Sequence, residues 1–261
     1  MKVLAIKRAE QFSPNSVEKD EAILKSVVGR LRERGHEVVI QRETDLSSDL
    51  KSFQMILTMS RLPETICLLK KMTGIKILNT PEGVEHCTRS NLEVIMNRMG
   101  IPKPLAEGTD GYWLKRGDAA AQTHDDVVYV ADKKTLTEKI KAFQDRGITQ
   151  YVVSAHVKGD LVKFYGVRDT GFFRWFYPTD DGMSKFGDER YNGVAQHYRF
   201  DEEDLQRKAD LLAGAVGIDI YGGDCVVKAN GTYCIIDFND WPSFSRCREE
   251  AADAIVSLVE N

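Results

Sequence analysis

The chain has 261 residues and a formal net charge of −4, and 29% of its residues are charged, with both signs mixed along the sequence. This length allows one large domain or two to three small lobes. The mixed charge argues against a basic face for nucleic acid, and no apolar run is long enough to span a bilayer. We therefore expect neither nucleic acid nor a membrane as a partner. Five cysteines lie far apart without a CxxC pair, which is typical of a reducing compartment and predicts a cytoplasmic protein.

The first 80 residues alternate between apolar strands and amphipathic helices. Strands are predicted at "KVLAI", "HEVVIQ", "FQMILTMS" and "KILN", and helices over about residues 17–34 and in "PETICLLKKMTG". Gly35 and Gly74 end the two helices. The alternation predicts a small parallel α/β sheet as a first lobe, residues 1–80.

Residues 81–157 show a different order of elements. A helical connector, "TPEGVEHCTRSNLEVIMNRMG", ends before Pro102 and Pro104. Strands follow at "YWLKRG", "DVVYVA" and "QYVVSAHV", with the helix "KKTLTEKIKAFQDRG" before the third strand. This order predicts a small antiparallel sheet with a helix packed on it, an α+β lobe.

Residues 158–261 are predicted to form a third lobe, also α+β. The segment "LVKFYGVRDTGFFRWFY" indicates a hairpin turning at residues 169–171, followed by a polar loop over 178–193 and a helix in "EEDLQRKADLLAGAVG". The strands "YGGDCVVKA" and "TYCIID" form a second hairpin around Asn230-Gly231. A last helix is predicted over about residues 246–259.

Three polar side chains converge at the end of the last hairpin. Asp224 and Asp237 are thirteen positions apart with the turn almost midway, so strand pairing brings the two carboxylates close. Asn239 follows at i+2, on the face of Asp237. Two carboxylates and an amide oxygen suit Mg²⁺, which also takes substrate phosphates as ligands. The alternative from these residues alone is a solvated polar end of a hairpin.

Lys115 stands near the end of the apolar strand "YWLK". A Gly-Asp-Ala-Ala-Ala loop follows it, and the small residues of this loop would let backbone amides approach phosphate oxygens. The alternative is a surface lysine before an ordinary turn. The order of Lys115 and the later carboxylates is what favours a nucleotide site.

Taken in order, these segments resemble the ATP-grasp superfamily over nearly the whole chain, in particular the group of the ribosomal-protein glutamate ligase and the D-alanyl-D-alanine ligase. The resemblance implies an ATP-grasp fold of mixed α/β and α+β class. It implies an N-terminal parallel α/β lobe, residues 1–80, a connector and small lobe, residues 81–157, and a large lobe, residues 158–261. The two α+β lobes would clasp ATP between them.

The resemblance assigns the phosphate contacts first. Arg89, in "GVEHCTRSNLEVIMNRMGIPKP", matches a connector position where many relatives carry a nucleotide-contacting lysine. Lys115, in "YWLKRGDAAAQ", matches the lysine that reaches the α- and β-phosphates. Lys163 matches a basic residue directed toward the phosphates or the acceptor.

The segment "YVVSAHVKGDLVKFYGV" is similar to the hinge between the two ATP-binding lobes. Backbone groups from Ser154 to Val157 would meet adenine, and Asp160 would bind the ribose. Because Ser154 or Ala155 replaces the usual glutamate before the hinge, backbone contacts would carry more of the adenine recognition.

The segment "FYPTDDGMSKFGDERYNG" is similar to the mobile loop of the large lobe. The resemblance places Lys185 at the γ-phosphate and gives Arg190 and Asn192 as the Arg-x-Asn pair that frames the reacting centre. These three residues are the predicted catalytic residues.

The hairpin "GGDCVVKANGTYCIIDFND" looks like the metal-binding hairpin of the superfamily. Asp224, Asp237 and Asn239 match its magnesium ligands, with Asp237 in place of the commoner glutamate. Since aspartate is one methylene shorter, the number of ions, one or two, stays open.

The resemblance implies an ATP-dependent carboxylate-amine ligase that works through an acyl phosphate with Mg²⁺. Its substrates would be a small carboxylate and an amine, or a protein or peptide tail. The alternatives are an ATP-grasp kinase acting on a small hydroxyl acceptor and a non-catalytic ATP-binding module. The oligomeric state is open, a homo-oligomer included.

The acceptor end is less defined than the ATP end. The segment from Asp240 to Phe244 replaces a proline- and glycine-rich turn that relatives place beside the acceptor, so we expect substrate choice to depend on it. Weaker acceptor candidates near the expected cleft are Arg168, Arg174, Trp175, His197, Trp241 and Ser243.

Overall fold

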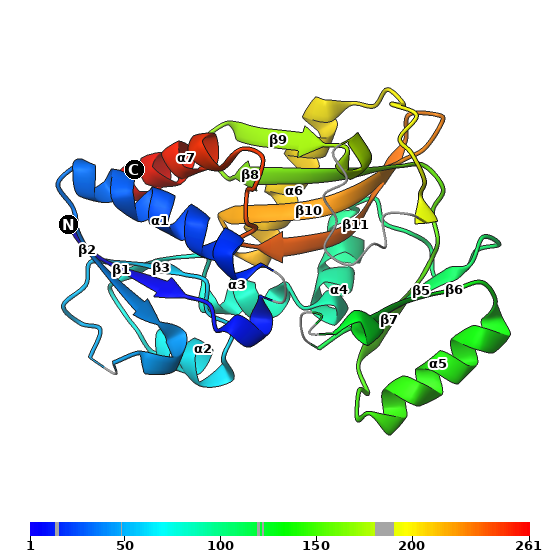
Figure 1. Cartoon of the computed structure of the whole chain (residues 1–261), viewed down its shortest axis with the longest axis horizontal. Helices are drawn as coiled ribbons and strands as arrows, with labels where there is room; N and C mark the ends of the chain where they lie inside the picture. The colour runs from blue at the N-terminus through cyan, green and yellow to red at the C-terminus, as the bar shows by residue number, and fades with distance from the viewer. Residues whose placement is uncertain (14–15, 48, 119–120, 122, 181–190) are drawn as a thin grey trace.

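The structure, a computed structural model, describes residues 1–261 except 14–15, 48, 119–120, 122 and 181–190. Its elements form three sheets with helices packed on them, the mixed α/β architecture that the sequence predicts (Figure 1). Short 3-10 turns occur at Glu10–Phe12, Glu43–Asp45, His124–Asp126 and Pro178–Asp180. Among the described residues, no helix has the length and apolar character needed to cross a membrane.

The first sheet is parallel and is covered on both faces. Its strand order is β2-β1-β3-β4, with bounds β1 Lys2–Lys7, β2 Glu37–Arg42, β3 Met55–Thr58 and β4 Lys76–Leu78. Val3 and Ala5 pack with α1, Val17–Glu33, whereas Leu4 and Ile6 pack in a second cluster with Leu69 of α2, Pro63–Lys70. Burial on both faces explains why β1 reads as a continuous apolar run.

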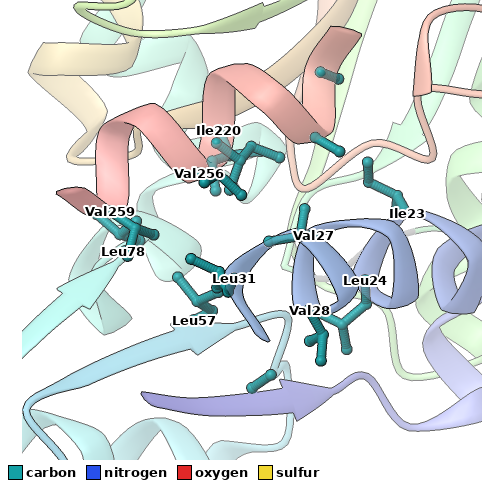
Figure 2. Close-up of a cluster of buried hydrophobic side chains, with 14 of the residues drawn as sticks. Ile23, Leu24, Val27, Val28, Leu31, Leu57, Leu78, Ile220, Val256 and Val259 are labelled. Atoms are coloured by element: carbon teal, nitrogen blue, oxygen red, sulfur yellow. The ribbon is translucent and has the colours of Figure 1, made fainter. Parts of the chain in front are cut away.

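Helix α1 also contacts the C-terminal helix α7, Arg248–Glu260. Val27 of α1 shares a buried cluster with Val256 and Val259 of α7 and with Ile220 at the start of β10 (Figure 2). The first and third predicted lobes therefore share one hydrophobic core, a contact that sequence periodicity does not indicate.

The connector and the small sheet follow the first sheet. The connector contains α3, Pro81–His86, and α4, Arg89–Met99. The small sheet is antiparallel in the order β6-β5-β7, with bounds β5 Tyr112–Arg116, β6 Val127–Val130 and β7 Tyr151–Ala155. Phe143 of α5, Lys133–Asp145, packs on Leu114 of β5, so one face of this sheet is closed and the other is left for Lys115.

The large sheet is antiparallel in the order β11-β10-β8-β9. Its bounds are β8 Asp160–Val167, β9 Phe172–Phe176, β10 Ile220–Val227 and β11 Tyr233–Asp240. Val162 and Phe164 of β8 share a core with Leu92 of α4 and Leu205 of α6, Glu202–Val216. Since side chains alternate along a strand, Lys163 of β8 lies on the opposite face.

Asn79, directly after β4, ties the first sheet to the large sheet. Its Oδ1 accepts hydrogen bonds from the backbone amides of Asp219 and Ile220 at 2.9 and 2.8 Å, and its Nδ2 donates to the Ile220 carbonyl at 2.7 Å. Its φ of 58° lies in the left-handed region, which asparagine tolerates. The start of β10 is thus fixed against the end of β4.

Candidate functional site

One cavity of about 350 Å³ is lined by residues of the small sheet, the large sheet and the first lobe. This volume is within the range of small-molecule sites. Of the predicted site residues that the structure describes, the cavity is lined by Arg89, Lys115, Ser154, Val157, Lys163, Asn192, Asp224, Asp237 and Asn239. The predicted catalytic residues Lys185 and Arg190 lie outside the described residues.

The two predicted metal-binding carboxylates lie directly opposite each other. Asp224 on β10 pairs with Asp237 on β11, as their spacing predicts, but the next pair toward the turn is Cys225 with Ile235. Ile236 is therefore an extra residue on β11, a β-bulge. In a regular ladder continued from the Cys225–Ile235 pair, Asp224 would lie opposite Ile236. The close approach of Asp224 and Asp237 therefore depends on the bulge.

The bulge also places Lys115. Its Nζ donates to the Ile236 carbonyl at 2.9 Å, a contact between the small sheet and β11. A carbonyl at a bulge lies outside the regular ladder, so it can accept from a side chain. The lysine is thereby held beside Asp237.

Each of the two carboxylates has a cationic neighbour. Lys163, opposite Asp224 on β8, places its Nζ 3.1 Å from Asp224 Oδ1, and Arg89 Nη2 lies 3.1 Å from Asp237 Oδ2. Burial would raise the pKa of Asp237, but the nearby charges of Arg89 and Lys115 outweigh this effect and hold its pKa below the usual value. Asp237 is therefore an anion at neutral pH and suited to binding a cation.

These donors fit a magnesium ion. The carboxylates of Asp224 and Asp237 and the amide of Asn239 all border the cavity. No group of three or more His, Cys, Asp or Glu placed for a metal occurs in the described part of the chain, so an ion here would also need oxygens from a nucleotide or water. That requirement matches Mg²⁺, which keeps few protein ligands.

The predicted hinge, residues 154–157, also lines the cavity. The backbone amides of Ala155 and His156 donate to Leu105 and Gly111 at 2.7 and 2.8 Å, so these two groups are engaged within the protein. Asn192 Nδ2 donates to the carbonyls of Val157 and Gly159 at 3.0 and 3.2 Å. In this arrangement Asn192, a predicted catalytic residue, fixes the backbone at the end of the predicted hinge through these two hydrogen bonds.

Asp160 does not line the cavity, in contrast to the predicted ribose contact. Its side chain is buried, and its two carboxylate oxygens accept hydrogen bonds from the backbone amides of Gln196 and Tyr198, both at 2.7 Å. With both oxygens engaged, Asp160 anchors the segment before α6. Its role in ribose binding stays a prediction.

Two of the six weaker acceptor candidates, Trp241 and Ser243, line the cavity, and so do Asp240 and Pro242 of the predicted acceptor segment. The other four do not line it and have partners elsewhere: Arg168 with Asp219, Arg174 with Glu250, Trp175 with Glu202, and His197 with Tyr177. The cavity formed by the described residues therefore gives no support for these four side chains as acceptor contacts.

Two arginines of the first lobe, Arg8 and Arg61, also line the cavity and are not among the residues predicted from the sequence. Arg8 Nη2 lies 3.3 Å from Asp240 Oδ2 and its Nη1 lies 3.1 Å from Asp20, while Arg61 contacts the other oxygen of Asp240. Arg8 and Arg61 follow β1 and β3 closely. The carboxyl ends of parallel strands meet at one edge of a sheet, where ligands commonly bind, and this signal could have identified both arginines.

No protein-family model matches the sequence, and no curated protein is significantly similar to it. Solved structures are similar over the whole chain. D-alanyl-alanine synthetase A from Vibrio cholerae has a TM-score of 0.70 at 12% identity, covering 100% of this chain and 98% of that chain. A RimK domain ATP-grasp protein from Sphaerobacter thermophilus has a TM-score of 0.67 at 15% identity and covers 100% of both chains.

A third similar structure is the D-alanine–D-alanine ligase from Bacillus anthracis complexed with ATP. Its TM-score is 0.66 at 14% identity, covering 100% of this chain and 95% of that chain. At such low sequence identities, the structural similarity is evidence for the fold alone. Because the three structures match this chain from end to end, the chain has the ATP-grasp fold.

Proposed function

We propose that the protein is an ATP-dependent carboxylate-amine ligase that works through an acyl phosphate with Mg²⁺. The observation that carries the proposal is the convergence of Lys115, Arg89 and Lys163 on the paired carboxylates of the β10–β11 hairpin within one cavity. Three cations beside a set of carboxylate oxygens are what a magnesium-bound triphosphate requires. The similar ligase from B. anthracis is complexed with ATP, which supports the same ligand here.

The roles of the residues at the ATP end follow from their chemistry. Lys115 and Lys163 would bind phosphate oxygens, and the hinge from Ser154 to Val157 would contact adenine. Asp224, Asp237 and Asn239 would hold Mg²⁺, and the ion supplies charge neutralisation of the phosphates when bound. Lys185, Arg190 and Asn192 stay predictions as catalytic residues.

The proposed reaction has two steps. A carboxylate oxygen of the substrate attacks the γ-phosphorus of ATP, the bond to the ADP oxygen breaks, and an acyl phosphate forms. The amine nitrogen then attacks the acyl carbon, inorganic phosphate leaves, and the amine loses a proton. The protein contributes positioning and fixed positive charge, which are the main protein contributions to phosphoryl transfer.

The acceptor is proposed to bind beside Arg61 of the first lobe and Ser243 after β11, which both line the cavity. Arg61 Nη2 forms an ion pair with Asp240 Oδ1, and only 14% of the Arg61 side chain is exposed. A planar guanidinium held in this way suits a carboxylate, whether on a small molecule or on a peptide tail.

The test is ADP release with Mg²⁺ and ATP over pools of amino acids, dipeptides and polyols. We expect release only when both a carboxylate and an amine are present, and its loss in Asp237→Ala. Asp145→Ala, an exposed aspartate on α5, is the matched control and should keep full activity. Release with one polyol alone would establish a kinase, and ATP binding without turnover in every pool would establish a non-catalytic module.

A further inference from the structure

Arg89 is the first residue of α4, and its guanidinium is fixed where three elements meet. Nη1 donates to the carbonyl of Arg116 at the end of β5 at 3.3 Å, and Nη2 donates to Asp237 Oδ2 on β11 at 3.1 Å. Its side chain is 15% exposed. A charge held by both the small sheet and the hairpin is part of the site rather than a mobile surface group.

Asp237 has little capacity left for two metal ions. Its Oδ2 accepts from Arg89, and its Oδ1 accepts from the backbone amide of Phe238 at 3.2 Å. A carboxylate that bridges two ions must offer a lone pair to each, and two of the lone pairs of Asp237 are already taken by Arg89 and Phe238. The guanidinium cannot give up its charge, since arginine stays protonated in proteins.

The second carboxylate differs in this respect. Asp224 pairs with Lys163, whose ammonium is a single compact charge at the end of a flexible stem and is 24% exposed. Such a side chain can turn toward a phosphate when an ion arrives, whereas the planar fork of Arg89 is held at two points. Asp224 and Asn239 can thus hold one ion together with Asp237 Oδ1, whereas Asp237 Oδ2 stays on Arg89.

We propose that Arg89 takes the place of one of two divalent cations at this hairpin, so that the protein binds a nucleoside triphosphate with a single divalent ion. The inference rests on the proposed function, because it requires ATP in this cavity. It decides between the one-ion and two-ion alternatives that the sequence leaves open.

The experiment counts ions without turnover. Mn²⁺ is titrated into the full-length protein saturated with a non-hydrolysable ATP analogue, and free Mn²⁺ is followed by its electron paramagnetic resonance signal. We expect one bound Mn²⁺ per bound nucleotide in the wild-type protein and in Arg89→Lys, which keeps the charge. Arg89→Ala is expected to bind two, because Asp237 Oδ2 is then released.

The matched control is Arg98→Ala, which removes an exposed arginine from the same helix, away from the cavity. It should bind one Mn²⁺, as the wild-type protein does. Two ions in the wild-type protein, or one ion in Arg89→Ala with the nucleotide still bound, would overturn the proposal. Nucleotide binding is measured separately by calorimetry, and its absence in the wild-type protein would instead reject the proposed function itself.

Discussion

The fully buried carboxylate of Asp240 joins the first lobe to the end of β11, and replacing it with asparagine tests this connection. Asp240 has no exposed side-chain surface and contacts Arg8 and Arg61, whose side chains are 9% and 14% exposed. Asparagine keeps one acceptor oxygen for one arginine. The other arginine would face an amide donor and lose its ionic partner.

The expected cost follows from this geometry. Removing one partner of a buried ion pair costs about 3–5 kcal/mol, because the remaining charge stays buried and uncompensated. Asp20, 3.1 Å from Arg8, still compensates that arginine, so we expect the lower end, about 3 kcal/mol. The measurement is the free energy of unfolding in urea at pH 7.

The matched control is Asp253→Asn on α7. Asp253 also pairs with an arginine, Arg30, but its side chain is 62% exposed, and exposed pairs contribute about 0–1 kcal/mol. We expect the control to stay within about 1 kcal/mol of the wild-type protein. If Asp240→Asn is equally mild, the buried network does not hold the first lobe to β11, and the reasoning from burial is wrong.

Three further changes test other parts of the site. Gly223→Ala places a Cβ 2.5 Å from the Asp237 carbonyl, so we expect it to destabilise the hairpin by about 2 kcal/mol in urea unfolding, whereas Gly29→Ala in α1 meets no atom within 4 Å and should be neutral or stabilising. Asn79→Ala removes three hydrogen bonds, two of them buried, and should cost about 3 kcal/mol in the same assay; a loss below about 1 kcal/mol would contradict it. Lys115→Met removes a fixed cation from the proposed phosphate site, so calorimetry should show ATP affinity lower by about tenfold or more, and unchanged affinity would refute its assignment.

The sequence predicts the elements of the three sheets well because their local signals are strong. The alternation of strand and helix in the first lobe and the Asn230-Gly231 turn follow from patterns of a few neighbouring residues. The pairing of Asp224 with Asp237 was also predictable from their spacing. The bulge at Ile236 that makes this pairing possible was not, because an extra residue in a strand leaves no distinct pattern in an apolar run.

Contacts between distant segments were harder to predict. Asp160 has the residue type for a ribose contact, but its burial under the amides of Gln196 and Tyr198 depends on the path of a loop that has no periodic signal. Arg8 and Arg61 follow strand ends, but their place at this cavity also depends on how α1, α7 and Asn79 hold the first lobe against the large sheet. Such contacts arise from tertiary packing, which local patterns do not encode.

The charges around the cavity explain how a chain with a net charge of −4 could take up a polyanion. Among the described residues, the lining carries five cationic side chains, Arg8, Arg61, Arg89, Lys115 and Lys163, and four acidic ones, Asp20, Asp224, Asp237 and Asp240. The near balance of these described side chains does not offset the several negative charges of a triphosphate, so we expect a divalent ion to enter with the nucleotide. Arg89 and Lys115 hold the pKa of Asp237 below its usual value, so this carboxylate is ionised before the nucleotide arrives. Nucleotide and ion should therefore bind as one unit, each raising the affinity for the other.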